Sequence, residues 1–195
     1  LEDLHRMAGM VRYAGEAAGA LESPPVSRVR HRLPWLLLGL VGSALATLVM
    51  SRFEAALSAH IAIAFFVPAI VYIADAIGTQ SEAIAVRGLS LSQAGLARLL
   101  RGEIATGTLL GAIIAGVALP AIWLAFGDPR LAVAVSAAIL AAGAVATTVG
   151  LLLPWLFSHA GLDPADGSGP IGTIIQDVAS LLIYFGCVSL LLGPA

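Results

Sequence analysis

One carboxylate stands alone in the apolar run near the end of the sequence. Asp177 lies within residues 170–192, which contain no lysine or arginine. On a helix, Thr173, Ser180 and Tyr184 share its face, because these residues follow one another at intervals of three and four. An ionised side chain inside a membrane span is costly and marks a functional position by default. The pattern therefore predicts that Asp177 meets a cation that passes through.

A second polar stripe occupies an earlier apolar run. It consists of Tyr72, Asp75, Thr79 and Glu82. Gln80 and Ser81 adjoin it, and Pro68 and Gly78 can kink or loosen the helix that carries it. Interrupted helices at membrane depth usually line a cavity or pore. The alternative is that these groups only hydrogen-bond neighbouring helices, which suits the hydroxyls and Gln80 better than ionised acids.

The available ligands indicate which metal such a site would hold. Carboxylates, hydroxyls and carbonyls are hard oxygen donors, whereas Cys187 is the only cysteine and the four histidines fall in termini or loops. Sparse acids suit Mg2+, which keeps much of its water and needs only one or two carboxylates. One Asp177 per chain provides few carboxylates for an ion-selectivity filter. We therefore expect a twofold dimer in which two copies of Asp177 face each other.

The elements that must position these side chains are membrane spans. Of 195 residues, 59% are hydrophobic and 11% charged, far from the composition of soluble domains. The net charge of −2 gives no indication of nucleic-acid binding, which usually requires a basic surface. We expect an all-α polytopic bundle of five transmembrane helices, each long enough for a bilayer. The predicted spans are Pro34–Met50, Ile61–Val86, Gly102–Phe126, Leu131–Leu153 and Pro170–Leu192.

Two further expectations concern the flanking segments. Residues 1–22 have the pattern of an amphipathic helix, and the loop predicted for residues 154–169 carries Asp163 and Asp166 before Pro170 starts the last helix. All ten basic residues are arginines, and eight of them fall on the cytoplasmic side if the N-terminus is inside. The positive-inside rule therefore predicts a cytoplasmic N-terminus in a multi-pass cell-membrane protein.

Four patches of the sequence resemble the membrane domain of the MgtE magnesium channel/transporter family. The most specific is the last, which combines the Leu162-Asp163-Pro164-Ala165 loop with Thr173 and Asp177. The others are Arg32–Leu36, Phe65–Pro68 with Gly78–Ser81 and Arg87–Leu89, and Glu103 with Gly107 and Gly111.

The resemblance implies a homodimeric Mg2+ pore with five spans per subunit, lined by the second and fifth helices. Asp177 and the Thr173 carbonyl would then bind the transported ion, with Asp163 near the cytoplasmic mouth. Ala74-Asp75-Ala76 departs from the family's Gly-Gly-Asn, and Glu82 replaces a small residue. The expected metal-contacting residues are Asp177, Thr173, Asp163, Asp75, Glu82, Gln80 and Glu103.

The resemblance also implies a domain plan, with residues 1–33 as a cytosolic connector and residues 34–195 as the transport domain. In the family a cytosolic region with CBS modules precedes the connector, and we expect that region upstream of this sequence rather than lost. The rival functions are a Mg2+ exchanger coupled to H+ or Na+ through Asp75 and Glu82, and an intramembrane aspartyl protease using Asp75 and Asp177. We expect no enzyme, because neither acid has the Gly-x-Gly-Asp context of such proteases.

Overall fold

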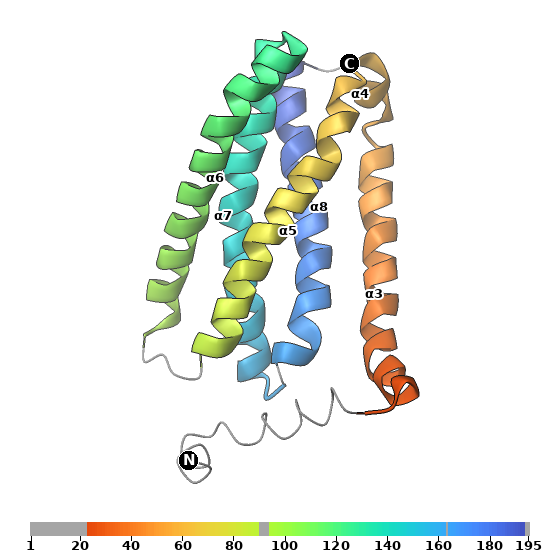
Figure 1. Ribbon diagram of the computed structural model, residues 1–195, viewed down its shortest axis with the longest axis vertical. Coiled ribbons are helices and arrows are strands. Elements are labelled where there is room, and N and C mark those ends of the chain that lie inside the picture. Colours follow the sequence, from red (N-terminus) through yellow and green to blue (C-terminus); the bar gives the residue numbers. More distant parts are fainter. Residues whose placement is uncertain (1–22, 90–93, 163, 194–195) are drawn as a thin grey trace. The chain divides into compact units, whose positions relative to one another are not determined.

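Every regular element in the described part of the chain is a helix. The computed structural model describes residues 23–89, 94–162 and 164–193. Its long helices are α3 (Pro25–Ser51), α5 (Ala62–Gly88), α6 (Leu96–Phe126), α7 (Pro129–His159) and α8 (Pro164–Leu192) (Figure 1). These five are long and apolar enough to cross a membrane, which confirms the predicted all-α fold with five spans. A short helix, α4 (Glu54–Ala59), follows α3 and was not predicted.

The helices extend beyond the apolar runs that reveal them, and this corrects two expectations. The loop predicted for residues 154–169 is mostly helical, since α7 continues to His159 and α8 already starts at Pro164. Pro170 therefore lies inside α8 and does not start it, and α5 passes through Pro68 without a break. Hydropathy marks only the lipid-facing part of a helix, whereas its hydrogen-bonded backbone can continue into the polar interface. The predicted helix at residues 1–22 lies outside the described residues.

The chain divides into a unit that ends at Leu37 and a unit that begins at Leu38, inside α3. In the second unit, α7 lies at the centre and packs against α5, α6 and α8, while α5 also packs against α8 (Figure 1). Over its most apolar window α7 is 56% buried, compared with 17% for α6. The second and fifth spans, α5 and α8, pack against each other, and both pack against the fourth span, α7.

Glycines set the closest approaches of α7 to its neighbours. A side-chain carbon at Gly107 of α6 would lie 2.4 Å from the carbonyl oxygen of Gly143 in α7, too close for any other residue. Similarly, a side-chain carbon at Gly150 of α7 would lie 2.5 Å from the carbonyl oxygen of Gly78 in α5. These contacts bring helix backbones together, as small residues do in membrane bundles. They also fix the part of α5 that carries the second polar stripe.

Large side chains fill the bundle at the end where α8 finishes. The hydroxyl of Tyr184 in α8 donates to the carbonyl oxygen of Ile63 in α5 at 2.8 Å, and both residues are fully buried. Phe185 stacks on Phe53, the residue before α4, with ring centroids 4.3 Å apart. Near the other half of α8, Gly42 of α3 lies against the side chain of Ile174. The Tyr184–Ile63 hydrogen bond therefore ties α8 to α5, and the other two contacts tie α8 to α3 and to the residue before α4.

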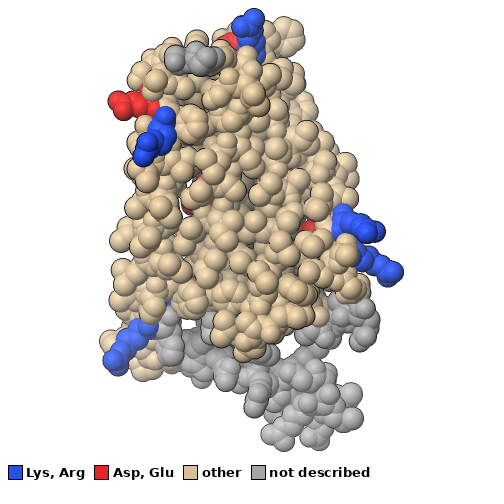
Figure 2. All heavy atoms as spheres, turned by 180° about the vertical axis from the view of Figure 1, so that it is seen from behind, with Lys and Arg blue, Asp and Glu red and all other residues tan. Residues whose placement is uncertain are grey.

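Charged residues are unevenly distributed over the helices. Arg87, Arg98 and Arg101 lie near the end where α5 finishes and α6 begins, whereas Arg52 and Arg130 belong to the opposite end. On the face in Figure 2, blue arginine side chains stand out from the surface, while the red acidic atoms in the middle of the face lie in recesses. The acids in the middle of this face are thus partly covered by neighbouring residues but remain visible from outside.

Candidate cation site

Two acids from different spans meet between α5 and α8. Asp75 of α5 and Asp177 of α8 are both half-buried, and the two carboxylates are near enough to repel each other. The hydroxyl of Thr173, one helical turn before Asp177, donates to Oδ1 of Asp75 at 3.3 Å. The one-turn spacing puts Thr173 and Asp177 on the same face of α8, turned towards α5. The structure thus brings together three of the residues that the sequence singled out.

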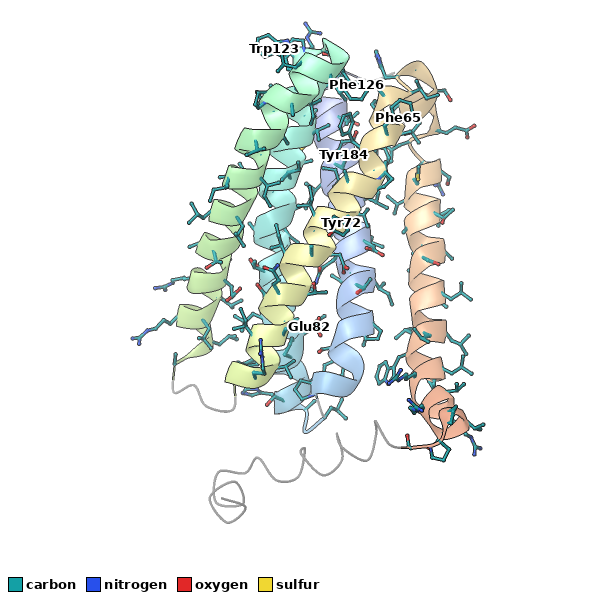
Figure 3. All side chains as sticks on the ribbon, viewed as in Figure 1. Phe65, Tyr72, Glu82, Trp123, Phe126 and Tyr184 are labelled. Atoms are coloured by element: carbon teal, nitrogen blue, oxygen red, sulfur yellow. The ribbon has the colours of Figure 1, made fainter. Side chains whose placement is uncertain are left out.

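The local structure of α5 leaves Asp75 available to a ligand. The hydroxyl of Thr79 is bonded back to the carbonyl oxygen of Asp75 at 2.8 Å, so it does not hold the carboxylate. Tyr72, one turn before Asp75, is 73% exposed and lies on α5 above Glu82 in Figure 3. The polar stripe of α5 therefore runs from an exposed position to a buried one along the helix.

The electrostatics of the Asp75–Asp177 pair call for a positive charge. Within the residues that the structure describes, neither carboxylate has an ion pair or hydrogen bond with an arginine. Two carboxylates and a hydroxyl are hard oxygen donors of the kind that Mg2+ and other hard cations bind. No group of three or more His, Cys, Asp or Glu residues in the described ranges is placed to hold a metal ion, so an ion bound at this pair would need further ligands such as water, carbonyl oxygens or groups of another chain.

Glu82 lies apart from this pair, deeper in the bundle. It is 9% exposed and accepts a hydrogen bond from the hydroxyl of Ser168, near the start of α8. Figure 3 shows Glu82 on α5 beside the first turns of α8. Glu82 is thus bonded to the first turns of α8, whereas Asp75 is bonded to Thr173, one turn before Asp177.

Glu103 contacts α5 and α7 instead of the acids. Its carboxylate accepts from the hydroxyl of Ser81 at 2.7 Å, and its backbone carbonyl accepts from Thr147 at 2.8 Å. These bonds tie the first turns of α6 to α5 and α7, which is what a structural role requires. Gln80 is exposed on α5 and belongs to neither group. Asp163 lies outside the described residues, as does the side chain of Asp166.

Two buried polar residues of α8 are not among the metal-contacting residues expected from the sequence. Ser168 is 1% exposed and bonded to Glu82. Gln176 is 2% exposed, and neither atom of its side-chain amide has a hydrogen-bond partner. The sequence shows Gln176 only as an amide next to Asp177 in an apolar run. The packing of the helices shows that its side chain points inward against Gly78.

Comparison with known proteins finds relatives for the part of the chain that contains Asp75, Thr173 and Asp177. Residues 67–187, from α5 to α8, match the sequence profile of the MgtE family, described as divalent cation transporter. Curated relatives named magnesium transporter MgtE include those of Bacillus subtilis (36% identical over 80% of this chain), Enterococcus faecalis (33% over 91%) and Thermus thermophilus (30% over 88%). The alignments cover 35%, 40% and 38% of these relatives, so the chain spans well under half of their length.

Proposed function

Because this chain belongs to the MgtE family of divalent cation transporters, we propose that it moves Mg2+ across a membrane through the site formed by Asp75, Thr173 and Asp177. Its five apolar helices make it a multi-pass membrane protein. The observation that carries the proposal is the pair of inward carboxylates with no positive partner among the described residues. Membership of a transporter family also sets the protease alternative aside.

Mg2+ fits this arrangement because it gives up its water reluctantly. Such an ion is usually bound through one or two carboxylates while several waters stay attached. Asp177 and Asp75 can accept hydrogen bonds from those waters, and the Thr173 carbonyl can supply a further oxygen. The site would then hold a hydrated ion while it passes and would not need a closed cage of protein ligands.

We propose that the complete pore forms between two copies of the chain. One copy provides only two nearby acids, and a twofold axis beside α5 and α8 would double that number. The outer faces of the helices would contact lipid.

With the N-terminus in the cytoplasm, Arg87, Arg98 and Arg101 lie inside, as the positive-inside rule favours for a cell-membrane protein. The membrane potential, worth about 2.3 kcal/mol per charge per 100 mV, would then drive Mg2+ inward.

The relatives are much longer than this chain, and their additional length bears on regulation. Since they extend far beyond the aligned part, we propose that a cytosolic region of CBS type is joined to this membrane domain. Residues 1–33 would connect the two parts.

A coupled exchanger is the second candidate, and the buried Glu82 favours it. A simple pore has no use for an enclosed carboxylate beside the ion path, whereas a coupling ion could bind there. Measuring Mg2+ uptake into proteoliposomes separates the two mechanisms. A channel predicts uptake that follows an imposed potential without any H+ or Na+ gradient, whereas an exchanger predicts uptake that stops when those gradients are abolished. The absence of Mg2+ uptake under both conditions would contradict the proposed function.

A further inference from the structure

Tyr72 is an exposed tyrosine in the middle of a membrane span. Its side chain is 73% exposed on α5, and Figure 3 shows it between Phe65 towards one end of the helix and Glu82 towards the other. Within the part of the chain that the structure describes, nothing forms a hydrogen bond with its hydroxyl or stacks on its ring. The packing of the bundle therefore gives no reason for a phenol at this position.

The depth of Tyr72 in the membrane keeps its hydroxyl away from the interface. Residues 62–71, which precede it in α5, are all apolar. At about 1.5 Å per residue, this run covers about half of the roughly 30 Å hydrocarbon core of a bilayer. Tyrosines of membrane proteins usually lie at the level of the headgroups, where the hydroxyl reaches water. Tyr72 is too deep for that, and a hydroxyl among lipid tails would lose its hydrogen bonds without replacement.

The exposed face of α6 shows how a lipid-facing surface is composed in this chain. Near the middle of α6, Leu109, Ile113 and Val117 are 63%, 58% and 69% exposed, and all three are aliphatic. The middle of α5 instead exposes Tyr72 and Thr79, which lie two turns apart on one face. This face of α5 is therefore turned towards something more polar than lipid.

Tyr72 lies one helical turn from Asp75, on the side away from Glu82. The spacing of three residues places Tyr72 and Asp75 on adjoining parts of one helix face. Asp75 is half-buried and accepts from Thr173 of α8, whereas Tyr72 is exposed. An ion that moves along this face from the end where α5 begins therefore meets the phenol before it meets the acids.

We propose that Tyr72 lines the ion path and accepts hydrogen bonds from the coordinated waters of Mg2+ before the ion reaches Asp75 and Asp177. This inference rests on the proposed Mg2+ transport and adds a specificity-determining residue to it. Mg2+ gives up its water reluctantly, so a residue that it meets early has to recognise the hydrated ion. A phenol offers a neutral oxygen that accepts hydrogen bonds from water. Such an oxygen binds the hydrated ion less tightly than a carboxylate does, so the ion can pass on to the two acids.

Thiol labelling tests whether Tyr72 faces the ion path, and it does not require a transport assay. Cys187, the only cysteine, is replaced by serine, and Tyr72→Cys and Ile113→Cys are introduced separately. Ile113 is the matched control, because it is also exposed near the middle of a span. A charged methanethiosulfonate reagent modifies the thiolate, which forms only where water reaches the sulfur. In lipid nanodiscs, Tyr72→Cys should therefore react roughly tenfold faster than Ile113→Cys.

The same labelling experiment shows whether the ion passes close to Tyr72. At constant ionic strength, a saturating concentration of Mg2+ should slow the labelling of Tyr72→Cys about threefold or more, because the bound ion repels the cationic reagent. Adding Asp177→Asn to the Tyr72→Cys protein should remove this protection. Mg2+ should not change the rate for Ile113→Cys.

Removing the hydroxyl alone tests what Tyr72 contributes to ion binding. Tyr72→Phe should raise the Mg2+ concentration for half-maximal flux about three- to tenfold, which is the effect of one lost hydrogen bond, with a smaller effect on the maximal flux. Its unfolding temperature should not change, because the hydroxyl has no partner among the described residues. Tyr184→Phe is the matched control, since it removes the same atom from a hydroxyl that donates to Ile63. It should lower the unfolding temperature and leave the half-maximal concentration unchanged.

Three results would overturn the proposal. If Tyr72→Cys reacts as slowly as Ile113→Cys, the side chain faces lipid or a tightly packed partner. Fast labelling that Mg2+ does not slow would place Tyr72 in water but away from the ion. A Tyr72→Phe protein with the wild-type concentration dependence would show that the hydroxyl binds no water of the ion. Failure of the proposed function is distinguishable, because the wild-type protein would then take up no Mg2+, while the labelling rates and their Mg2+ dependence would still decide the place of Tyr72.

Discussion

Asp75 is the residue at which this sequence departs from the pattern that the family resemblance leads us to expect. The structure places it beside Thr173 and near Asp177. In the absence of metal, two neighbouring carboxylates repel each other and destabilise the fold. A divalent ion reverses the sign of this interaction. Asp75 should therefore contribute to ion affinity and should oppose stability in the apo state.

Replacing Asp75 with alanine tests this division. We expect Asp75→Ala to raise the Mg2+ concentration for half-maximal flux about tenfold, equivalent to roughly 1.4 kcal/mol. The unfolding temperature without Mg2+ should stay the same or rise, since the repulsion is removed. Glu54→Ala, which removes an exposed acid from α4, is the control and should change neither quantity. A lower unfolding temperature with unchanged ion dependence would identify Asp75 as a structural acid.

At the scale of the helices, hydropathy revealed every span but not where the helices end. The runs around Asp177 and Asp75 could be read as polar stripes because helical periodicity alone puts those residues on one face. The roles of Glu103 and Gln176 could not be read in this way. Glu103 meets Ser81, and Gln176 meets Gly78, only because glycines let particular helices approach closely. Such contacts depend on tertiary packing, which no local sequence pattern contains.

The close contact of α6 with α7 gives a prediction about stability. Gly107→Ala should lower the free energy of unfolding by about 1–3 kcal/mol, because its methyl group would overlap the Gly143 carbonyl. Gly116→Ala in the same helix points into open space and should be neutral or stabilising by up to about 1 kcal/mol. Denaturation of both variants in detergent measures the difference. Equal stabilities would mean that α6 and α7 do not approach at Gly107.

For the whole molecule, the proposed pore requires two copies of the chain arranged around α5 and α8. In a Cys187→Ser background, Thr79→Cys on the exposed part of the α5 stripe should form a disulfide with itself in membranes. Val117→Cys, which is 69% exposed on α6, should not, because α6 lies away from the proposed axis. Cross-linked dimers on non-reducing gels report the result. A strong Val117 dimer without a Thr79 dimer would move the interface to α6.

The central claim is that Asp177 binds the Mg2+ ion that crosses the membrane. Flux of Mg2+ into proteoliposomes at a fixed inside-negative potential tests it most directly, with wild-type and Asp177→Asn proteins reconstituted at equal density. Asparagine has nearly the same shape but no charge, so the fold should persist, and Glu54→Gln controls for the loss of a surface carboxylate. We predict that Asp177→Asn lowers the flux at least tenfold while its unfolding temperature stays at or above that of the wild type. Wild-type flux from a well-folded Asp177→Asn protein would contradict the account.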